Sequence, residues 1–265
     1  MRKLYLLLLL ASLPLLARAQ RKVTAPTAIW PELQVNYGVG EDGLLFLWNG
    51  YRMNTDERYN DLRDQGPLSS FERVELSLGY EHALTEHWRG GALIRYAAED
   101  FPTTLFYTLF LRHSGNIGSL YFNKQLMFEY VDQEEQDTFG RFRLMAELGR
   151  RLPLKSRFIT PSISYEAMLL SNLGREYDGS PAERNIDRTR LRLSLNYELT
   201  EKLRINPYYM RQTDYYYVLV PPKYDDNGQL LEDGYTTKRN RITPILGLEI
   251  KYSINRPANT ASISY

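Results

Sequence analysis

The chain has 265 residues, no cysteine, a formal charge of +1 and 21 tyrosines. The lack of cysteine excludes disulfides and a lipid-modified cysteine, and the balanced charge without a basic block argues against nucleic-acid binding. The mean hydropathy is negative (−0.45) and only the N-terminus carries a long apolar run, which argues against a helical membrane protein. A β-barrel remains possible, because its inward-facing residues are polar and lower the average hydropathy.

Residues 1–19 are expected to be a cleaved signal peptide. The basic start MRK precedes the apolar run LYLLLLLASLPLL, and Ala17-Arg18-Ala19 has the small-x-small pattern of a cleavage site. The apolar run is short for a bilayer span, so a retained membrane anchor is the weaker alternative. Residues 20–265 are then predicted to form one exported all-β domain.

Alternation with period two predicts about eleven strands in this domain, most of them near the roughly 9–11 residues that a tilted strand needs to cross a bilayer. Apolar residues share one face of each strand, and all but one of the clearest faces end in tyrosine, as in an aromatic girdle at a membrane boundary. Segments 44–52 and 104–112 are apolar on both faces, so their orientation is open. In chain order, the clear apolar faces are Leu33/Val35/Tyr37, Val74/Leu76/Leu78/Tyr80, Ala92/Ile94/Tyr96, Leu126/Phe128/Tyr130, Phe142/Leu144/Ala146/Leu148, Ile159/Pro161/Ile163/Tyr165, Leu191/Leu193/Leu195/Tyr197, Leu203/Ile205/Pro207/Tyr209 and Leu246/Leu248/Ile250/Tyr252.

The opposite faces carry charged residues that we expect to line the lumen of a barrel. On a soluble sheet the same residues would form a solvated outer face, which is the alternative interpretation. Arginines and glutamates are nearly balanced in number, which favours ion pairs across a narrow lumen over the single-sign lining of a selective channel. The candidate lumen-lining residues are Arg73, Glu75, Arg95, Glu129, Arg141, Arg143, Glu147, Glu166, Arg190, Arg192 and Glu249, and Glu32 shares their pattern.

The connections between the predicted strands alternate in length, as they do in outer-membrane barrels with short periplasmic turns and longer extracellular loops. Short turns are expected at 83–87, 114–118, 150–156 and 199–202, and longer links at 53–70, 97–103, 132–138, 171–187 and 218–240. The predicted fold is an all-β, transmembrane, antiparallel up-and-down β-barrel of ten to twelve strands. Twelve is preferred, because the strands at 29–39 and 242–252 would run in the same direction and an antiparallel barrel then needs one more strand. Residues 20–28 are a poor candidate for it.

No cofactor and no catalytic or metal site is predicted. The three histidines, His82, His87 and His113, lie in or beside short turns, and we interpret them as turn residues. The acidic segment YDDNGQLLED (224–233) partly matches a calcium-binding loop but lacks its ligand spacing, so a polar hairpin tip at Asn227-Gly228 is expected.

Several segments resemble those of a known family. IWPELQVNYGV, YEHALTEHWRGGALIRY, RFRLMAEL, RTRLRLSLNYELTEKLRINPYY and GLEIKY are similar to the uncharacterised outer-membrane barrel family of Bacteroidota called domain of unknown function 2490. The resemblance covers most of residues 20–265 and implies the fold, but the family has no assigned activity or catalytic residue. The final ASISY (261–265) resembles the C-terminal recognition signal of outer-membrane barrels.

The sequence therefore predicts a non-enzymatic protein of the bacterial outer membrane, either structural or a narrow occluded pore. Its expected partners are outer-membrane lipid and the barrel-assembly machinery, with no nucleic acid and no assigned small-molecule ligand. One alternative is a cell-surface hydrolase that uses rim acids such as Asp56, Glu57, Asp178 or Glu183. Another is a secreted soluble ligand-binding barrel with its apolar faces turned inward.

Overall fold

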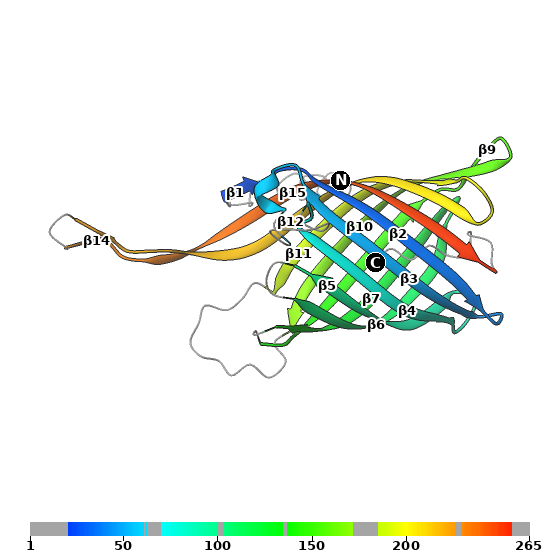
Figure 1. Cartoon of the computed structure of the whole chain (residues 1–265), viewed down its shortest axis with the longest axis horizontal. Helices are drawn as coiled ribbons and strands as arrows, with labels where there is room; N and C mark the ends of the chain where they lie inside the picture. Colours follow the sequence, from blue (N-terminus) through cyan, green and yellow to red (C-terminus); the bar gives the residue numbers. More distant parts are fainter. Residues whose placement is uncertain are drawn as a thin grey trace, which may run out of the picture.

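The computed structural model describes residues 21–60, 62, 70–99, 103–134, 137–171, 185–225 and 229–255. The predicted signal peptide and the C-terminal ASISY lie outside these residues. Eleven of the described strands close into a barrel (Figure 1): β2 (Ala28–Val39), β3 (Gly43–Asn54), β4 (Arg73–Ala83), β5 (Trp88–Ala98), β6 (Thr104–Ile117), β7 (Leu120–Gln133), β8 (Phe139–Gly149), β10 (Arg157–Ser171), β11 (Ile186–Glu198), β12 (Leu203–Val220) and β15 (Tyr235–Ile254).

The remaining elements are short. They are β1 (Arg21–Thr24), the 3-10 helix η2 (Glu57–Tyr59), β9 (Leu152–Leu154), β13 (Lys223–Tyr224) and β14 (Leu230–Glu232). Within the described part of the chain, no helix has the length and apolar character needed to span a membrane.

The barrel closes through one parallel pair of strands. Each strand from β2 to β15 is antiparallel to its neighbour, whereas β2 and β15 run side by side in the same direction, from Ala28 opposite Ile245 to Tyr37 opposite Ile254. The preference for twelve strands was therefore wrong, although the range of ten to twelve was correct. The two end strands do share one direction, and a parallel ladder joins such strands without a further crossing.

In the predicted segment 20–28, the described residues before β2 do not supply an additional crossing strand. β1 pairs in parallel with β15, with Arg21 opposite Arg239 and Thr24 opposite Ile242. β1 thus lies along the same neighbour as β2 and in the same direction, so it lengthens the closing seam.

Short and long connections lie at opposite ends of the barrel, as predicted. The short-turn end carries the links β2–β3, β4–β5, β6–β7, β8–β10 and β11–β12. Gly40 and Gly118 lie in two of these turns with φ of 59°, a left-handed conformation that glycine adopts without steric cost. The longer links lie at the other end, which we call the long-loop end.

The predicted link at 218–240 is largely strand. β12 and β15 pair as far as Val220 opposite Tyr235, and their twisted hairpin projects beyond the long-loop end (Figure 1). Its residues are rich in tyrosine, threonine and valine, which favour extended pairing. Residues 226–228, including the predicted Asn227-Gly228 turn, lie outside the described residues.

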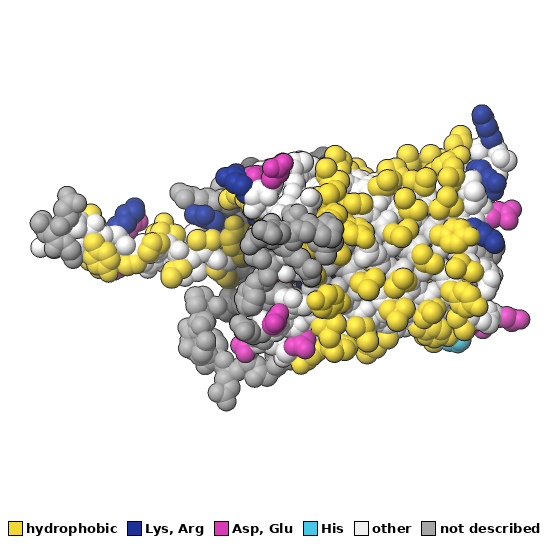
Figure 2. Space-filling model, viewed as in Figure 1, with side chains coloured by type: hydrophobic (Ala, Val, Ile, Leu, Met, Phe, Trp, Pro, Cys, Tyr) yellow, Lys and Arg dark blue, Asp and Glu magenta, His cyan; other side chains and the backbone are white. Residues whose placement is uncertain are grey.

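The predicted apolar faces point outward. Leu78 is 55% exposed and Leu109 is 63% exposed, and apolar side chains cover the outer wall between charged rims (Figure 2). Segments 44–52 and 104–112, whose orientation was open, also alternate between outward and inward side chains. In the first, Leu45 and Leu47 point outward, whereas Phe46 is buried. The inward orientation of the apolar faces, which the soluble-barrel alternative assumed, is therefore wrong for this chain.

Glycines make room for large side chains inside the barrel. Tyr208 lies opposite Gly247 on the neighbouring strand, and a Cβ on Gly247 would lie 1.9 Å from Tyr208 Cζ. Phe46 covers Gly79 in the same way, with 2.2 Å between its Cζ and such a Cβ. These aromatic rings lie over glycines because the lumen of an eleven-strand barrel is narrow.

Candidate functional site

A continuous series of ion pairs crosses the lumen. It begins at Glu75, whose carboxylate lies 2.8 Å from Arg52 and 2.8 Å from Arg73. Arg95 lies 3.9 Å from Glu75 and 2.8 Å from Glu129, so it links the two glutamates. These five residues come from β3, β4, β5 and β7.

The series continues through Glu129, whose side chain is 0% exposed. Its carboxylate lies 2.7 Å from Arg141 and 3.1 Å from Arg143. Arg143 also lies 2.6 Å from Glu166, and Glu166 lies 3.3 Å from Arg190. We call this set the ion-pair chain: Arg52, Arg73, Glu75, Arg95, Glu129, Arg141, Arg143, Glu166 and Arg190.

Strand register places these charges together. The β7–β8 ladder sets Glu129 opposite Arg141, and the β10–β11 ladder sets Glu166 opposite Arg190. Directly opposite side chains on one face of a sheet are close enough to interact. Each carboxylate faces more than one arginine, so the buried carboxylates, which would be costly alone, are compensated within the ion-pair chain.

A second group of charges lies nearer the short-turn end. Glu249 lies 3.4 Å from Arg192 and 2.9 Å from Lys251, and it accepts a hydrogen bond of 2.9 Å from Asn206. The guanidinium of Arg192 also lies over the ring of Tyr208, 3.6 Å from its centroid. Tyr208 in turn donates a hydrogen bond to Glu32.

All the candidate lumen-lining residues lie on the inward faces of their strands. Three of them, Glu147, Arg192 and Glu249, lie outside the ion-pair chain. Glu147 accepts a hydrogen bond of 2.9 Å from the hydroxyl of Tyr121.

Several inward charges were not among the residues predicted from the sequence. Glu81 lies 2.7 Å from Arg89 and also pairs with Arg112. Arg112 is the last residue of segment 104–112, whose orientation was open. Because the charged residues of the other strands point inward, the charge of Arg112 could have assigned its face to the lumen. That face also carries Thr104, Phe106, Thr108 and Phe110. Lys251 shares the face of Glu249 and could have been found by the same alternation.

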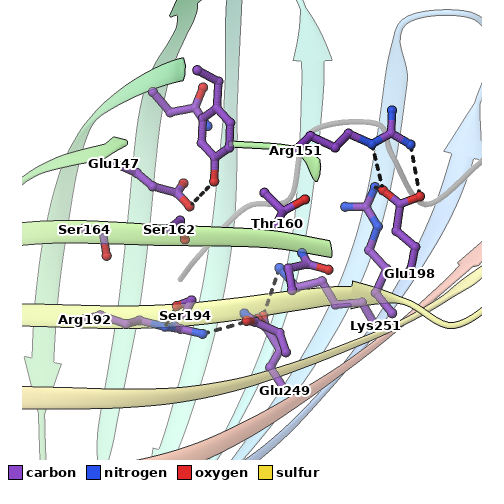
Figure 3. Close-up of a pocket in the computed structure, with 15 residues that line it drawn as sticks. Glu147, Arg151, Thr160, Ser162, Ser164, Arg192, Ser194, Glu198, Glu249 and Lys251 are labelled. Carbon is purple, nitrogen blue, oxygen red and sulfur yellow. Dashed lines mark hydrogen bonds and ion pairs between the residues drawn. The ribbon is translucent and has the colours of Figure 1, made fainter. Parts of the chain in front are cut away.

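A polar cavity of about 300 Å³ occupies the lumen at the short-turn end. Its wall comes from β7, β8, β10, β11, β12 and β15, and Figure 3 shows its side chains. Thr160, Ser162 and Ser164 follow one another on the inward face of β10, and Ser162 lies opposite Ser194 of β11. These short side chains leave the wall hollow, whereas arginines and glutamates fill the lumen farther along the same strands.

The cavity holds its own set of charges. Arg151 donates two hydrogen bonds to Glu198, of 3.2 and 3.0 Å. Its side chain is 42% exposed, which places the mouth of the cavity beside it at the short-turn end. Arg204, whose side chain is 8% exposed, lies 3.7 Å from the same carboxylate.

The three histidines do not form a catalytic arrangement with one another or with other residues in the described part of the chain. The rings of His87 and His113 lie 6.1 Å apart, and Trp88 packs edge-on against His113. The hydroxyl of Tyr80 lies 3.2 Å from Nδ1 of His82. No group of three or more potential metal ligands occurs among the described residues.

The rim acids of the hydrolase alternative are only partly described. Asp56 caps η2 by accepting a hydrogen bond from the backbone N–H of Arg58. Hydrogen bonds from the Arg58 side chain also lower the pKa of the Asp56 carboxyl, which disfavours a role as a proton donor. Glu57 is the first residue of η2. Asp178 and Glu183 lie outside the described residues.

Residues 27–216 match the model of a family described as protein of unknown function (DUF2490). The match spans β2 to β11 and most of β12, so it includes the ion-pair chain and much of the cavity wall. No curated protein matches the chain.

Proposed function

The chain belongs to the DUF2490 family of proteins of unknown function, and we propose that it is an outer-membrane β-barrel whose lumen is closed by buried ion pairs. The observation that carries this proposal is the inverted distribution of polarity. Leucines such as Leu76 and Leu144 are nearly half exposed on the outer wall, whereas Glu129 and Arg143 are buried inside. A barrel in lipid needs this arrangement, because its outer band contacts hydrocarbon.

Outward tyrosines near the strand ends support a membrane location. Tyr37, Tyr80 and Tyr252 lie near the short-turn end, and Tyr96 and Tyr130 lie near the long-loop end. Each ring is more than a third exposed. Tyrosine has an apolar ring and a polar tip, which suits the boundary between lipid and water at both ends of such a barrel.

The packing of the lumen supports a closed barrel. Beside the ion-pair chain, two small hollows have volumes of only about 30 and 20 Å³, each enough for about one or two water molecules. A conducting pore needs a continuous hydrated path, so we expect the intact protein to conduct almost no ions.

Membrane fractionation and gel mobility test the location of the protein. We expect it in the outer-membrane fraction, with a different mobility before and after boiling, because a folded barrel keeps its compact shape in detergent. Recovery in the soluble fraction without heat-modifiable migration would contradict the proposal. Planar-bilayer recordings of the refolded full chain would contradict the closed lumen if they showed steady open-channel currents.

Epitope tags test the orientation. We expect a tag inserted within 171–187 or 224–234 to be reached by antibody on intact cells, because longer loops of outer-membrane barrels face outward and tolerate insertion. A tag in the turns 150–156 or 199–202 is the matched control and should be reached only after permeabilisation. Labelling of the short turns on intact cells would reverse the orientation.

A further inference from the structure

We propose that the cavity at the short-turn end binds a small hydroxylated anion of the class of sugar acids and sugar phosphates. This inference goes beyond the closed membrane barrel proposed above and rests on the cavity itself. Its volume of about 300 Å³ lies at the lower end of the usual range for small-molecule pockets, which suits a ligand of monosaccharide size.

The wall presents many groups that can bind hydroxyls. Thr160, Ser162, Ser164 and Ser194 supply hydroxyl groups that donate or accept hydrogen bonds. Figure 3 shows them on the two adjacent strands β10 and β11. A purely apolar ligand would displace water from these polar groups and form no hydrogen bonds with them, which is costly.

Asparagine side chains add amide groups to the wall. Among the described residues, the buried Oδ1 atoms of Asn196 and Asn206 have no hydrogen-bond partner. A hydroxyl of a bound sugar can donate to a carbonyl oxygen of this kind. The amides and hydroxyls together therefore favour a ligand with several hydroxyl groups.

The charges on the wall favour an anion. Four cationic side chains and three carboxylates line the cavity. Glu249 is shared by Arg192 and Lys251, at 3.4 and 2.9 Å. The carboxylates are thus already engaged by cations or by Tyr121, and the surplus charge of the wall is positive.

Arg204 is the cation with the weakest compensation. Both oxygens of Glu198 accept hydrogen bonds from Arg151, while Arg204 lies 3.7 Å from this carboxylate. The Nε of Arg204 is buried and has no hydrogen-bond partner within the described part of the chain. A guanidinium binds carboxylate or phosphate groups through paired N–H donors. We therefore place the anionic group of the ligand beside Arg204 and its hydroxyls toward β10 and β11.

Calorimetry of the refolded full chain in detergent micelles tests this site. The probes are glucuronate, glucose 6-phosphate and, as the neutral control, glucose. We expect at least one of the two acidic sugars to bind about tenfold or more tightly than glucose, because glucose lacks the charge that pairs with the guanidinium. Binding of glucuronate alone would identify a carboxylate site, and binding of both acids would identify a general anion site.

Two variants and a matched control assign the binding to the cavity. Arg204→Gln should weaken acidic-sugar binding about tenfold, to near the level of glucose. Ser162→Gln should weaken it without a change of charge, because the longer side chain fills the space. Lys202→Gln removes the same charge from an exposed turn at this end of the barrel and should bind as the parent does. Heat-modifiable migration confirms the folding of each variant.

The proposal is wrong if neither acidic sugar binds at about 10 mM, or if glucose binds as tightly as the acids. It is also wrong if the folded Arg204→Gln and Ser162→Gln variants both bind like the parent. Such failures leave the membrane proposal standing, since fractionation and conductance test that separately.

Discussion

The middle of the lumen and its short-turn end are built by the same strands, yet one is filled and the other is hollow. In the middle, inward positions carry long charged side chains, as Glu166 and Arg190 show on β10 and β11. Toward the short turns, the same two strands carry Ser162 and Ser194. Both regions are polar, so side-chain length rather than polarity decides whether the barrel is plugged or holds a cavity.

The largest difference between the two regions is expected for removal of a carboxylate. Glu129→Ala leaves Arg95, Arg141 and Arg143 around a lost charge and should lower the free energy of unfolding by about 3–5 kcal/mol. Glu147→Ala in the cavity loses the hydrogen bond from Tyr121 and should cost only about 1 kcal/mol. Urea unfolding in detergent micelles measures both values. Equal losses would mean that the ion-pair chain is hydrated and not shielded from water.

The second-largest difference between variants of the two regions is expected in their conductance. Arg190→Ala with Arg192→Ala removes partners of Glu166 and Glu249, so it should lower the unfolding temperature and raise the conductance from near zero. Ser162→Ala with Ser164→Ala enlarges the cavity but leaves the ion-pair chain intact, so the conductance of this variant should stay near zero. Planar-bilayer recording distinguishes these outcomes. If the arginine variant keeps the stability and conductance of the parent, the closed-lumen proposal fails.

The smallest difference is expected for two glycines that face aromatic rings. Gly247→Ala forces a methyl group against Tyr208 within the filled region and should cost about 1–3 kcal/mol. Gly149→Ala brings a Cβ to 2.4 Å from the Tyr121 hydroxyl, but this ring borders the cavity and can move into it. We therefore expect a loss of less than about 1 kcal/mol for Gly149→Ala. Thermal unfolding measures the two shifts, and a larger loss at Gly149 would show that the cavity cannot accommodate the ring.

Local alternation determined much of this protein. The outward faces, the inward charges and the sorting of short and long connections all follow from residues a few positions apart. Leu191 and Arg192 must point to opposite sides of any strand, whatever the rest of the chain does. The family resemblance could be read at the same level, because it rests on strand and turn patterns.

Only the tertiary structure decided how the barrel closes and which charges meet. The parallel pairing of Ala28 with Ile245 joins residues from opposite ends of the chain, and no local pattern specifies such a contact. The same holds for Arg95 and Glu129, which are brought to 2.8 Å across an intervening strand. Register and closure are properties of the whole sheet, so they also decide where short side chains gather into a cavity.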